Sequence, residues 1–166
     1  VLLYVAGHET TVNLIGNGLY ALLRHPDERR RWVDDPSLDS NAVDELLRYD
    51  GPVQHTVRVP TVDVVYGDVP VAKGTVVLTV LGAANHDPSV FDEPHRLRLD
   101  RSTAGRHLAF AAGVHYCLGA SLARLEAGIA LSRLVRRFPA LALDGDVHWR
   151  DRLTIRGVDR LPVALR

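Results

Sequence analysis

The only cysteine of the chain, Cys117, lies in the segment Phe110-Ala-Ala-Gly-Val-His-Tyr-Cys-Leu-Gly119, directly before a pattern typical of a long helix. At the start of a helix, backbone N–H donors and the positive end of the helix dipole stabilise a thiolate anion. Gly113 permits a sharp turn with positive φ ahead of the cysteine, and Gly119 leaves room for a flat group to approach the helix. A thiolate that faces open space is suited to bind a heme iron as an axial ligand.

Cys117 also has two interpretations that need no heme. A lone cysteine is more commonly a small hydrophobic core residue, and the segment alone does not decide between this role and that of a ligand. A cysteine hydrolase would need His115 as its base. Residues two apart on an extended strand point to opposite faces, so we expect His115 to be badly placed to deprotonate Cys117.

The first half of the chain is predicted to contain three helices, at residues 1–24, 26–33 and 41–49. The first is already under way at Val1, because no capping residue precedes its apolar run. Asp39 or Ser40 is expected to cap the third helix. Residues 56–81 are rich in Val, Thr and Tyr with turn residues between them, which predicts a small meander of strands.

The second half begins with an irregular surface stretch at residues 85–109, rich in Asp, Pro, Arg and His. A long helix is predicted at residues 118–138. Its apolar positions share one face, which we expect to lie in a core. These positions are Leu118, Leu122, Leu125 and Ile129, and the face is widened by Ala123, Ala127, Ala130, Leu131 and Leu134. Residues 153–165 are expected to form a last hairpin across Val158-Asp159. The predicted fold class is mainly α with small β meanders (α+β).

The composition excludes several classes of partner. The 166 residues suffice for one domain, and 20 basic and 20 acidic residues give a formal net charge of zero. We therefore expect no nucleic acid or anionic membrane as partner. No apolar run approaches the roughly 20 residues that span a bilayer. A single cysteine cannot form an internal disulfide, which suits the cytoplasm.

The cysteine segment resembles the heme-ligand motif of the cytochrome P450 superfamily. The matching positions are Phe110, Gly113, His115, Cys117 and Gly119. Ala111 departs from the family, which usually has Gly there, and we expect the added methyl group to shift the loop slightly without abolishing heme binding. The resemblance implies the C-terminal part of the cytochrome P450 fold, incomplete at its N-terminus, with residues 1–166 belonging to a single heme-binding domain.

The resemblance also implies a set of heme contacts. Cys117 would ligate the iron of heme b (iron protoporphyrin IX), His115 would donate to one propionate, and Arg58 would bind a propionate from the strand region. A solvated surface charge is the alternative for Arg58. The other residues expected to contact the cofactor are Ala6, Gly7, Thr10, Phe110, Gly119 and Ala123.

The segment Ala6-Gly-His-Glu-Thr-Thr11 resembles the oxygen-binding kink of the family's long central helix. A glycine and a threonine that bonds back to the helix loosen its hydrogen-bond ladder. Glu9 and Thr10 would then be the catalytic acid and alcohol that relay protons to dioxygen. A zinc protease would need a histidine four residues after His8, where the chain has Val12.

Two further segments resemble the family's fold-holding network. Glu45-Leu-Leu-Arg48 matches its Glu-x-x-Arg helix, and residues three apart share a helical face. Pro94-His-Arg-Leu97 stands at its Pro-x-Arg-Phe position. Arg96 is therefore expected to complete a buried cluster with Glu45 and Arg48.

By resemblance, the activity is insertion of one oxygen atom from dioxygen into a small hydrophobic substrate. Electrons would come from a ferredoxin or similar donor, which Arg124 and Arg133 would help to dock; a solvated helix charge is the alternative for Arg124. A catalytically inactive scaffold that activates a partner enzyme is the second functional hypothesis. The 166 residues are expected to need the N-terminal remainder of the fold, and to be inactive alone.

Overall fold

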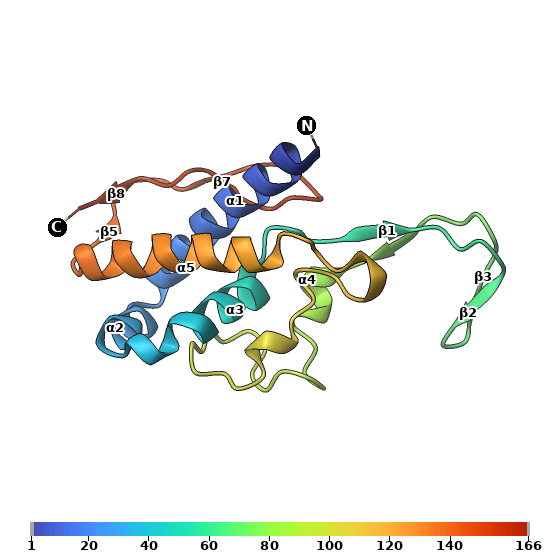
Figure 1. Cartoon of the computed structure of the whole chain (residues 1–166), viewed down its shortest axis with the longest axis horizontal. Helices are drawn as coiled ribbons and strands as arrows, with labels where there is room; N and C mark the ends of the chain where they lie inside the picture. Colours follow the sequence, from blue (N-terminus) through green and yellow to red (C-terminus); the bar gives the residue numbers. More distant parts are fainter. Residues whose placement is uncertain (1, 166) are drawn as a thin grey trace.

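The computed structural model describes residues 2–165, without the side chains of Leu2, Leu3 and Val5. Its helices α1 (Leu2–Arg24), α3 (Asp39–Asp50) and α5 (Ala120–Arg137) pack against one another, and α2 (Pro26–Asp34) joins them at one end (Figure 1). The three helices predicted in the first half are confirmed, although the expected start at Val1 lies outside the described residues. Within residues 2–165, no helix is long and apolar enough to cross a membrane.

The start of α3 differs from the prediction. A 3-10 turn, Pro36–Leu38, leads directly into the helix, and Leu38 occupies the cap position without a side-chain bond. Asp35 caps this turn instead, because its carboxylate accepts a hydrogen bond of 2.9 Å from the Ser37 N–H. The proposed caps Asp39 and Ser40 already lie inside the helix.

The core lies where the four helices meet. Its fully buried side chains include Leu22 of α1, Trp32 of α2, Leu46 of α3 and Leu131 of α5. Burying such side chains stabilises the fold by roughly 1.5–3 kcal/mol each. A Cβ at Gly18 would lie 3.0 Å from the Leu131 Cδ1 atom, so a larger residue would force Leu131 to shift where α1 crosses α5.

The predicted core face of α5 is confirmed in part: Ala127 and Leu131 are buried, but the four positions named first for that face are not. Leu118, just ahead of the helix, is 91% exposed, and Leu122, Leu125 and Ile129 are also exposed. The face that packs on α1 and α3 carries Ala127, Leu131 and Val135, whose small or branched side chains fit the close helix crossings. The prediction of an amphipathic helix from its apolar spacing is therefore correct, but α5 carries two apolar faces, of which one is buried and one is exposed.

A long finger of strands projects from the helices (Figure 1). Strand β1 (Thr56–Arg58) pairs antiparallel with β4 (Val77–Thr79), and β2 (Val64–Tyr66) pairs antiparallel with β3 (Val69–Val71). Gly67 allows the tight turn between β2 and β3 with a φ of +60°. The predicted meander is thus confirmed. A four-residue helix, α4 (Leu81–Ala84), and the irregular stretch follow it.

The C-terminal segment runs back along α1 in two strand pairs. Strand β5 (Ala142–Leu143) pairs with β8 (Val163–Ala164), and β6 (His148–Trp149) pairs with β7 (Val158–Arg160). The hairpin predicted across Val158-Asp159 is therefore wrong, because these residues lie within a strand. Contact with α1 fixes this path: a Cβ at Gly157 would lie 1.9 Å from the Asn13 Oδ1 atom.

A buried ion cluster ties α3 to the irregular stretch. Arg48 is 1% exposed and Glu45 is 0% exposed, and the guanidinium donates from Nε and Nη2 to the two carboxylate oxygens at 2.7 and 2.9 Å. The third member is Arg101, whose Nε lies 3.1 Å from both Glu45 oxygens. The prediction of Arg96 in this place is wrong. Its side chain is exposed beside Glu93, and only its carbonyl oxygen faces the cluster.

Candidate functional site

The cysteine loop, residues 110–119, carries Cys117 on an exposed turn in front of α5. The Cys117 N–H donates to the Phe110 carbonyl at 3.0 Å, which closes the loop. A 3-10 turn at Gly113–His115 forms its tip. Gly113 has a φ of +69°, which confirms the predicted turn, and α5 begins three residues after the cysteine rather than directly after it.

His115 and Cys117 are not on an extended strand, so the geometric premise against a His–Cys pair is wrong. His115 ends the 3-10 turn, and both side chains are exposed. No bond between them is found among the described residues. The arrangement holds the sulfur in open space, and the interpretation of Cys117 as a buried core residue is wrong.

Ala111 has a φ of +58°, in the left-handed region that favours glycine. Its N–H donates to the Leu108 carbonyl at 2.8 Å, so the loop imposes this conformation on a residue with a side chain. The departure from the family's glycine at this position therefore stores strain in the loop.

Ala111→Gly is expected to raise the free energy of unfolding by about 0.5–1 kcal/mol. An L-residue in the left-handed region costs roughly 1–2 kcal/mol, and the greater freedom of glycine in the unfolded chain offsets part of the gain. Urea unfolding of the heme-loaded protein measures the change. Ala112 is the matched control, because its φ of −150° suits alanine and Ala112→Gly should destabilise. If both substitutions changed the free energy of unfolding by the same amount, the proposed strain at Ala111 would be contradicted.

The surface around Cys117 fits a flat apolar group with a metal at its centre. Val114 is 98% exposed and Leu118 is 91% exposed, although both are apolar. A Cβ built at Gly113 meets nothing within 4 Å, and one at Gly119 meets only the Cys117 Sγ at 3.9 Å. A soft anionic ligand, an apolar surround and a space without side chains are what a heme needs on its ligand side.

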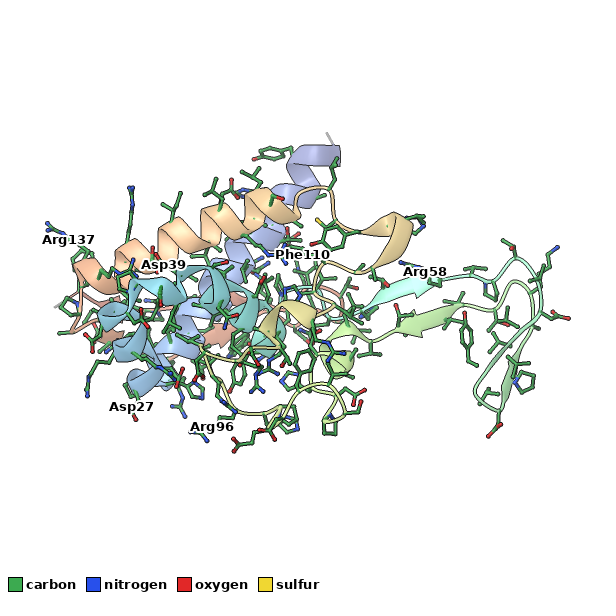
Figure 2. The ribbon with its side chains drawn as sticks, turned by 60° about the horizontal axis from the view of Figure 1, so that its bottom comes forward. Asp27, Asp39, Arg58, Arg96, Phe110 and Arg137 are labelled. Atoms are coloured by element: carbon green, nitrogen blue, oxygen red, sulfur yellow. The ribbon has the colours of Figure 1, made fainter. Side chains whose placement is uncertain are left out.

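The two residues expected to bind the propionates, Arg58 and His115, are both exposed. Arg58 donates from Nη1 to the Val57 carbonyl at 2.8 Å and to the Thr56 hydroxyl at 3.3 Å, so it has no acidic partner among the described residues. Figure 2 shows Arg58 on β1 at the side where the cysteine loop and Phe110 lie. His115 lies on the loop itself.

The first turns of α1 carry the expected alcohol and acid. The Thr10 hydroxyl donates to the Ala6 carbonyl at 2.8 Å, which confirms the predicted bond back to the helix. The Glu9 carboxylate does not face Thr10: its Oε1 accepts from Arg152 at 2.6 Å and from Arg150 at 3.3 Å. Glu9 also lines a hollow of about 330 Å³ together with Tyr4, His8, Val12 and Arg150. Gly7 is exposed with open space around it.

Ala123 lies half-buried in the first turn of α5, where its N–H donates to the Gly119 carbonyl at 2.9 Å. It follows the cysteine loop directly along the helix. The expected contact of Ala123 with the cofactor stays a prediction.

Arg124 is half-buried and bonded to other residues of the protein, so it is not a freely solvated helix charge, although 31% of its side chain is exposed. Its Nε donates to Asp44 at 2.7 Å, its Nη1 donates to the Tyr116 hydroxyl at 3.2 Å, and its guanidinium lies 4.7 Å from the centre of the Phe110 ring. Burial works to raise the pKa of Asp44, but hydrogen bonds from His107 and Arg124 hold that pKa below its ordinary value. No pattern in the sequence indicates Asp44 as the partner of Arg124.

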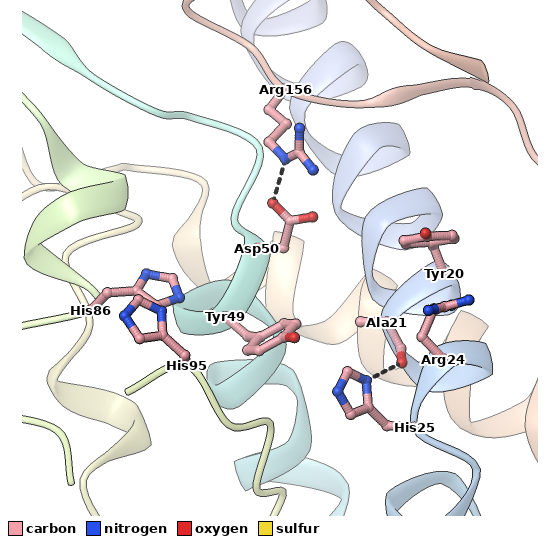
Figure 3. Close-up of a pocket in the computed structure, with 9 residues that line it drawn as sticks. All are labelled: Tyr20, Ala21, Arg24, His25, Tyr49, Asp50, His86, His95 and Arg156. Atoms are coloured by element: carbon pink, nitrogen blue, oxygen red, sulfur yellow. Dashed lines mark hydrogen bonds and ion pairs between the residues drawn. The ribbon is translucent and has the colours of Figure 1, made fainter. Parts of the chain in front are cut away.

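A second hollow, of about 560 Å³, lies between α1, α3 and the irregular stretch (Figure 3). Burial raises the pKa of Asp50 there, although Arg156 donates to it at 2.8 Å. His86 and His95 stack with ring centres 5.1 Å apart. Within the described part of the chain, no group of three or more His, Cys, Asp or Glu side chains could hold a metal ion. Sequence reasoning assigned no function to these residues.

Comparison with known proteins gives a consistent match. The family model for cytochrome P450 matches residues 38–154. The chain is 49% identical over 166 residues to cytochrome P450 107B1 of Saccharopolyspora erythraea, a match covering 98% of this chain and 41% of that relative. It is also 49% identical over 169 residues to cytochrome P450 monooxygenase PikC of Streptomyces venezuelae, covering 99% of this chain and 40% of the relative. The chain thus spans about two fifths of the length of these curated relatives.

Solved structures agree with the sequences. The crystal structure of P450BioI with an acyl carrier protein ligated to hexadec-9Z-enoic acid superposes with a TM-score of 0.96 at 44% identity, covering 99% of this chain and 43% of that one. The P450 monooxygenase TamI bound to tirandamycin C gives a TM-score of 0.95 at 45% identity, with coverage of 99% and 42%. The match covers both the helices and the small strands of this chain.

Proposed function

This chain belongs to the cytochrome P450 family, and we propose that residues 1–166 form the C-terminal, heme-binding part of a single-domain monooxygenase. The observation that carries this proposal is the exposed Cys117 on a closed loop, with the exposed apolar side chains of Val114 and Leu118 and the open space at Gly113 beside it. When bound, heme b supplies the activation of dioxygen, so that one oxygen atom enters an organic substrate and two electrons come from an external donor.

Cys117 is the proposed ligand to the iron, and its thiolate would supply electron density to the metal. The loop presents the sulfur away from the core, and the Phe110 carbonyl fixes the cysteine N–H. Arg58 and His115 are proposed to bind the two propionates. Both side chains are exposed and can donate hydrogen bonds, Arg58 from strand β1 and His115 from the cysteine loop. Ala6, Gly7 and Ala123 are proposed to leave room for the macrocycle.

Thr10 and Glu9 are proposed to handle protons. The Thr10 hydroxyl is held on α1 by the Ala6 carbonyl, which leaves its oxygen able to accept a further hydrogen bond. The Glu9 carboxylate lines the hollow of about 330 Å³ beside α1. This hollow is the proposed route by which Glu9 exchanges protons with water, with Arg150 and Arg152 holding the carboxylate at its wall.

The proposed substrate is a small hydrophobic molecule. Residues 53–57 and 153–155 lie side by side, since Val53 bridges Ile155 and the Gln54 N–H donates to the Thr154 carbonyl at 3.0 Å. Their exposed apolar side chains, Val57 and Leu153, would form part of the pocket wall. Relatives include a vitamin D(3) 25-hydroxylase of Pseudonocardia autotrophica and 6-deoxyerythronolide B hydroxylase of Saccharopolyspora erythraea, whose names describe the hydroxylation of organic molecules.

Two partners complete the proposal. An N-terminal remainder of the fold would cover the exposed leucine face of α5, because large apolar patches rarely stay in water. A ferredoxin or similar protein would supply electrons. An inactive scaffold would need neither the thiolate nor the threonine that this chain keeps.

The experiment that tests the function is a carbon-monoxide difference spectrum of the reduced, complete protein. A monooxygenase with Cys117 as ligand gives a thiolate-type band and consumes dioxygen when an electron donor is added. A protein that folds without taking up heme would instead support the scaffold hypothesis.

Thr10→Ala is expected to keep heme binding and oxygen consumption, while product formed per electron falls at least about tenfold and hydrogen peroxide is released. The reason is the loss of a hydroxyl positioned for proton transfer, which typically contributes 10²–10⁴-fold. Product and peroxide are measured together during turnover. Thr11→Ala, one residue further along α1, is the control and should form as much product per electron as the unchanged protein. Full product yield in Thr10→Ala would remove the proposed role.

A further inference from the structure

Arg124 connects three parts of the protein behind the cysteine loop. It is the fifth residue of α5, seven residues after Cys117, and its Nε donates to Asp44 of helix α3 at 2.7 Å. Its Nη1 reaches the hydroxyl of Tyr116, the residue before the cysteine, at 3.2 Å. The face of the guanidinium lies 4.7 Å from the ring centre of Phe110, the first residue of the loop.

The two loop residues that Arg124 contacts are the ones that place the sulfur. Phe110 supplies the carbonyl that accepts the Cys117 N–H at 3.0 Å, and Tyr116 is bonded directly to the cysteine. Their rings also meet edge to face, 6.3 Å apart. A movement of either ring is therefore transmitted to Cys117 through one hydrogen bond or one peptide bond.

Asp44 fixes the other end of this connection. The Ala109 N–H donates to His107 Nδ1 at 3.1 Å, so the neutral His107 ring carries its proton on Nε2 and donates it to Asp44 Oδ1 at 3.2 Å. The same oxygen accepts from Arg124. Asp44 thus holds the guanidinium against the loop from a rigid helix, and hydrogen bonds between charged groups are the stronger kind.

We infer that Arg124 is a positioning residue, which clamps the cysteine loop from behind and so sets how firmly Cys117 binds the iron. This inference rests on the proposed function, because it needs Cys117 to be the heme ligand. It replaces the docking of an electron donor as the main role of Arg124, since three internal contacts occupy the guanidinium.

The test uses the complete, heme-loaded protein and measures the rate of heme loss to a scavenger protein, together with the thiolate-type spectrum. Arg124→Gln is expected to speed heme loss about tenfold, because a cation–π contact and charge-assisted hydrogen bonds are lost together. Arg124→Lys keeps the charge near Asp44 and should restore part of the wild-type rate. Arg133→Gln is the matched control, with the same charge change at an exposed position of α5, and should stay within about twofold.

The outcomes separate the inference from the function. A wild-type protein without a thiolate-type band contradicts the proposed function, and the inference with it, before any variant is compared. With that band present, an Arg124→Gln protein that matches Arg133→Gln overturns the inference alone. A second result would also overturn the inference: the variant loses heme at the wild-type rate, but the donor reduces it more slowly and this rate depends on salt. That result would indicate that Arg124 docks the electron donor.

A second variant decides the case if Arg124→Gln does not fold. Tyr116→Phe removes only the hydroxyl that accepts from Arg124, on a side chain that is 51% exposed. Heme loss that is several-fold faster, with unchanged thermal melting and a shifted reduction potential, supports positioning, because general stability alone would not move the potential at constant melting. Unchanged heme loss and potential overturn it.

Discussion

Replacing Cys117 by serine is expected to abolish the thiolate-type carbon-monoxide band while leaving the secondary structure intact. These 166 residues contain one cysteine and no methionine, so no other sulfur among them can take the position at the iron. The side chain is exposed and lies outside the buried core, and its substitution therefore removes no packing. A serine hydroxyl is a much poorer ligand for this metal, and heme content should fall strongly as well.

The measurement combines heme content, the difference spectrum and far-ultraviolet circular dichroism on the complete protein. Val114→Ser is a matched control, because Val114 stands in the same loop and is 98% exposed, yet carries no proposed ligand. It should keep the band. A Cys117→Ser protein with an unchanged spectrum would show that the iron ligand lies elsewhere.

Local patterns predicted the helices and the cysteine loop well, because their causes are local. His25-Pro26 ends α1 where the missing proline N–H and the fixed ring break the helix. The positive φ of Gly113 follows from the sharp turn that the motif requires. The bond from Thr10 to Ala6 follows from the geometry of a helix, in which residues four apart are stacked.

Contacts between distant segments could not be predicted from spacing. The backbone of the irregular stretch turns its carbonyl oxygens toward Arg48, which donates to those of Asn85, Pro94 and Arg96. At Arg96 it is the carbonyl that faces the cluster, while the side chain is 65% exposed. Arg101 enters the cluster in its place, and only the path of the chain shows this.

The helix α5 shows a second limit of sequence patterns. Its apolar residues predict an amphipathic helix, but two faces are apolar and the sequence does not tell which one its neighbours cover. The small residues of one face allow α1 and α3 to approach, and the leucines of the other stay exposed. Arg124 was likewise visible only as a charge near the cysteine, because its partners lie on α3 and in the loop.

Arg48→Ala is expected to lower the free energy of unfolding by about 3–5 kcal/mol, a large part of a total of roughly 5–15 kcal/mol. The guanidinium is buried and bonds Glu45 through two nitrogens, and it also donates to three carbonyl oxygens of the irregular stretch. Removal leaves those carbonyls without their donor and leaves Glu45 with Arg101 as its remaining charged partner. Urea unfolding measured by circular dichroism, together with heme content, gives the size of the effect.

Arg96→Ala is the control that tests the identity of the cluster, because it removes an arginine of the same stretch whose side chain is 65% exposed. It should change the unfolding free energy by no more than about 0.5 kcal/mol, the usual range for surface positions. Arg101→Ala should resemble Arg48→Ala, since its guanidinium is 3% exposed and bonds Glu45 and the carbonyls of the irregular stretch. A protein in which Arg96→Ala destabilises and Arg101→Ala does not would reverse the assignment of the third arginine. An Arg48→Ala protein that melts normally with full heme would show that the cluster does not hold the fold.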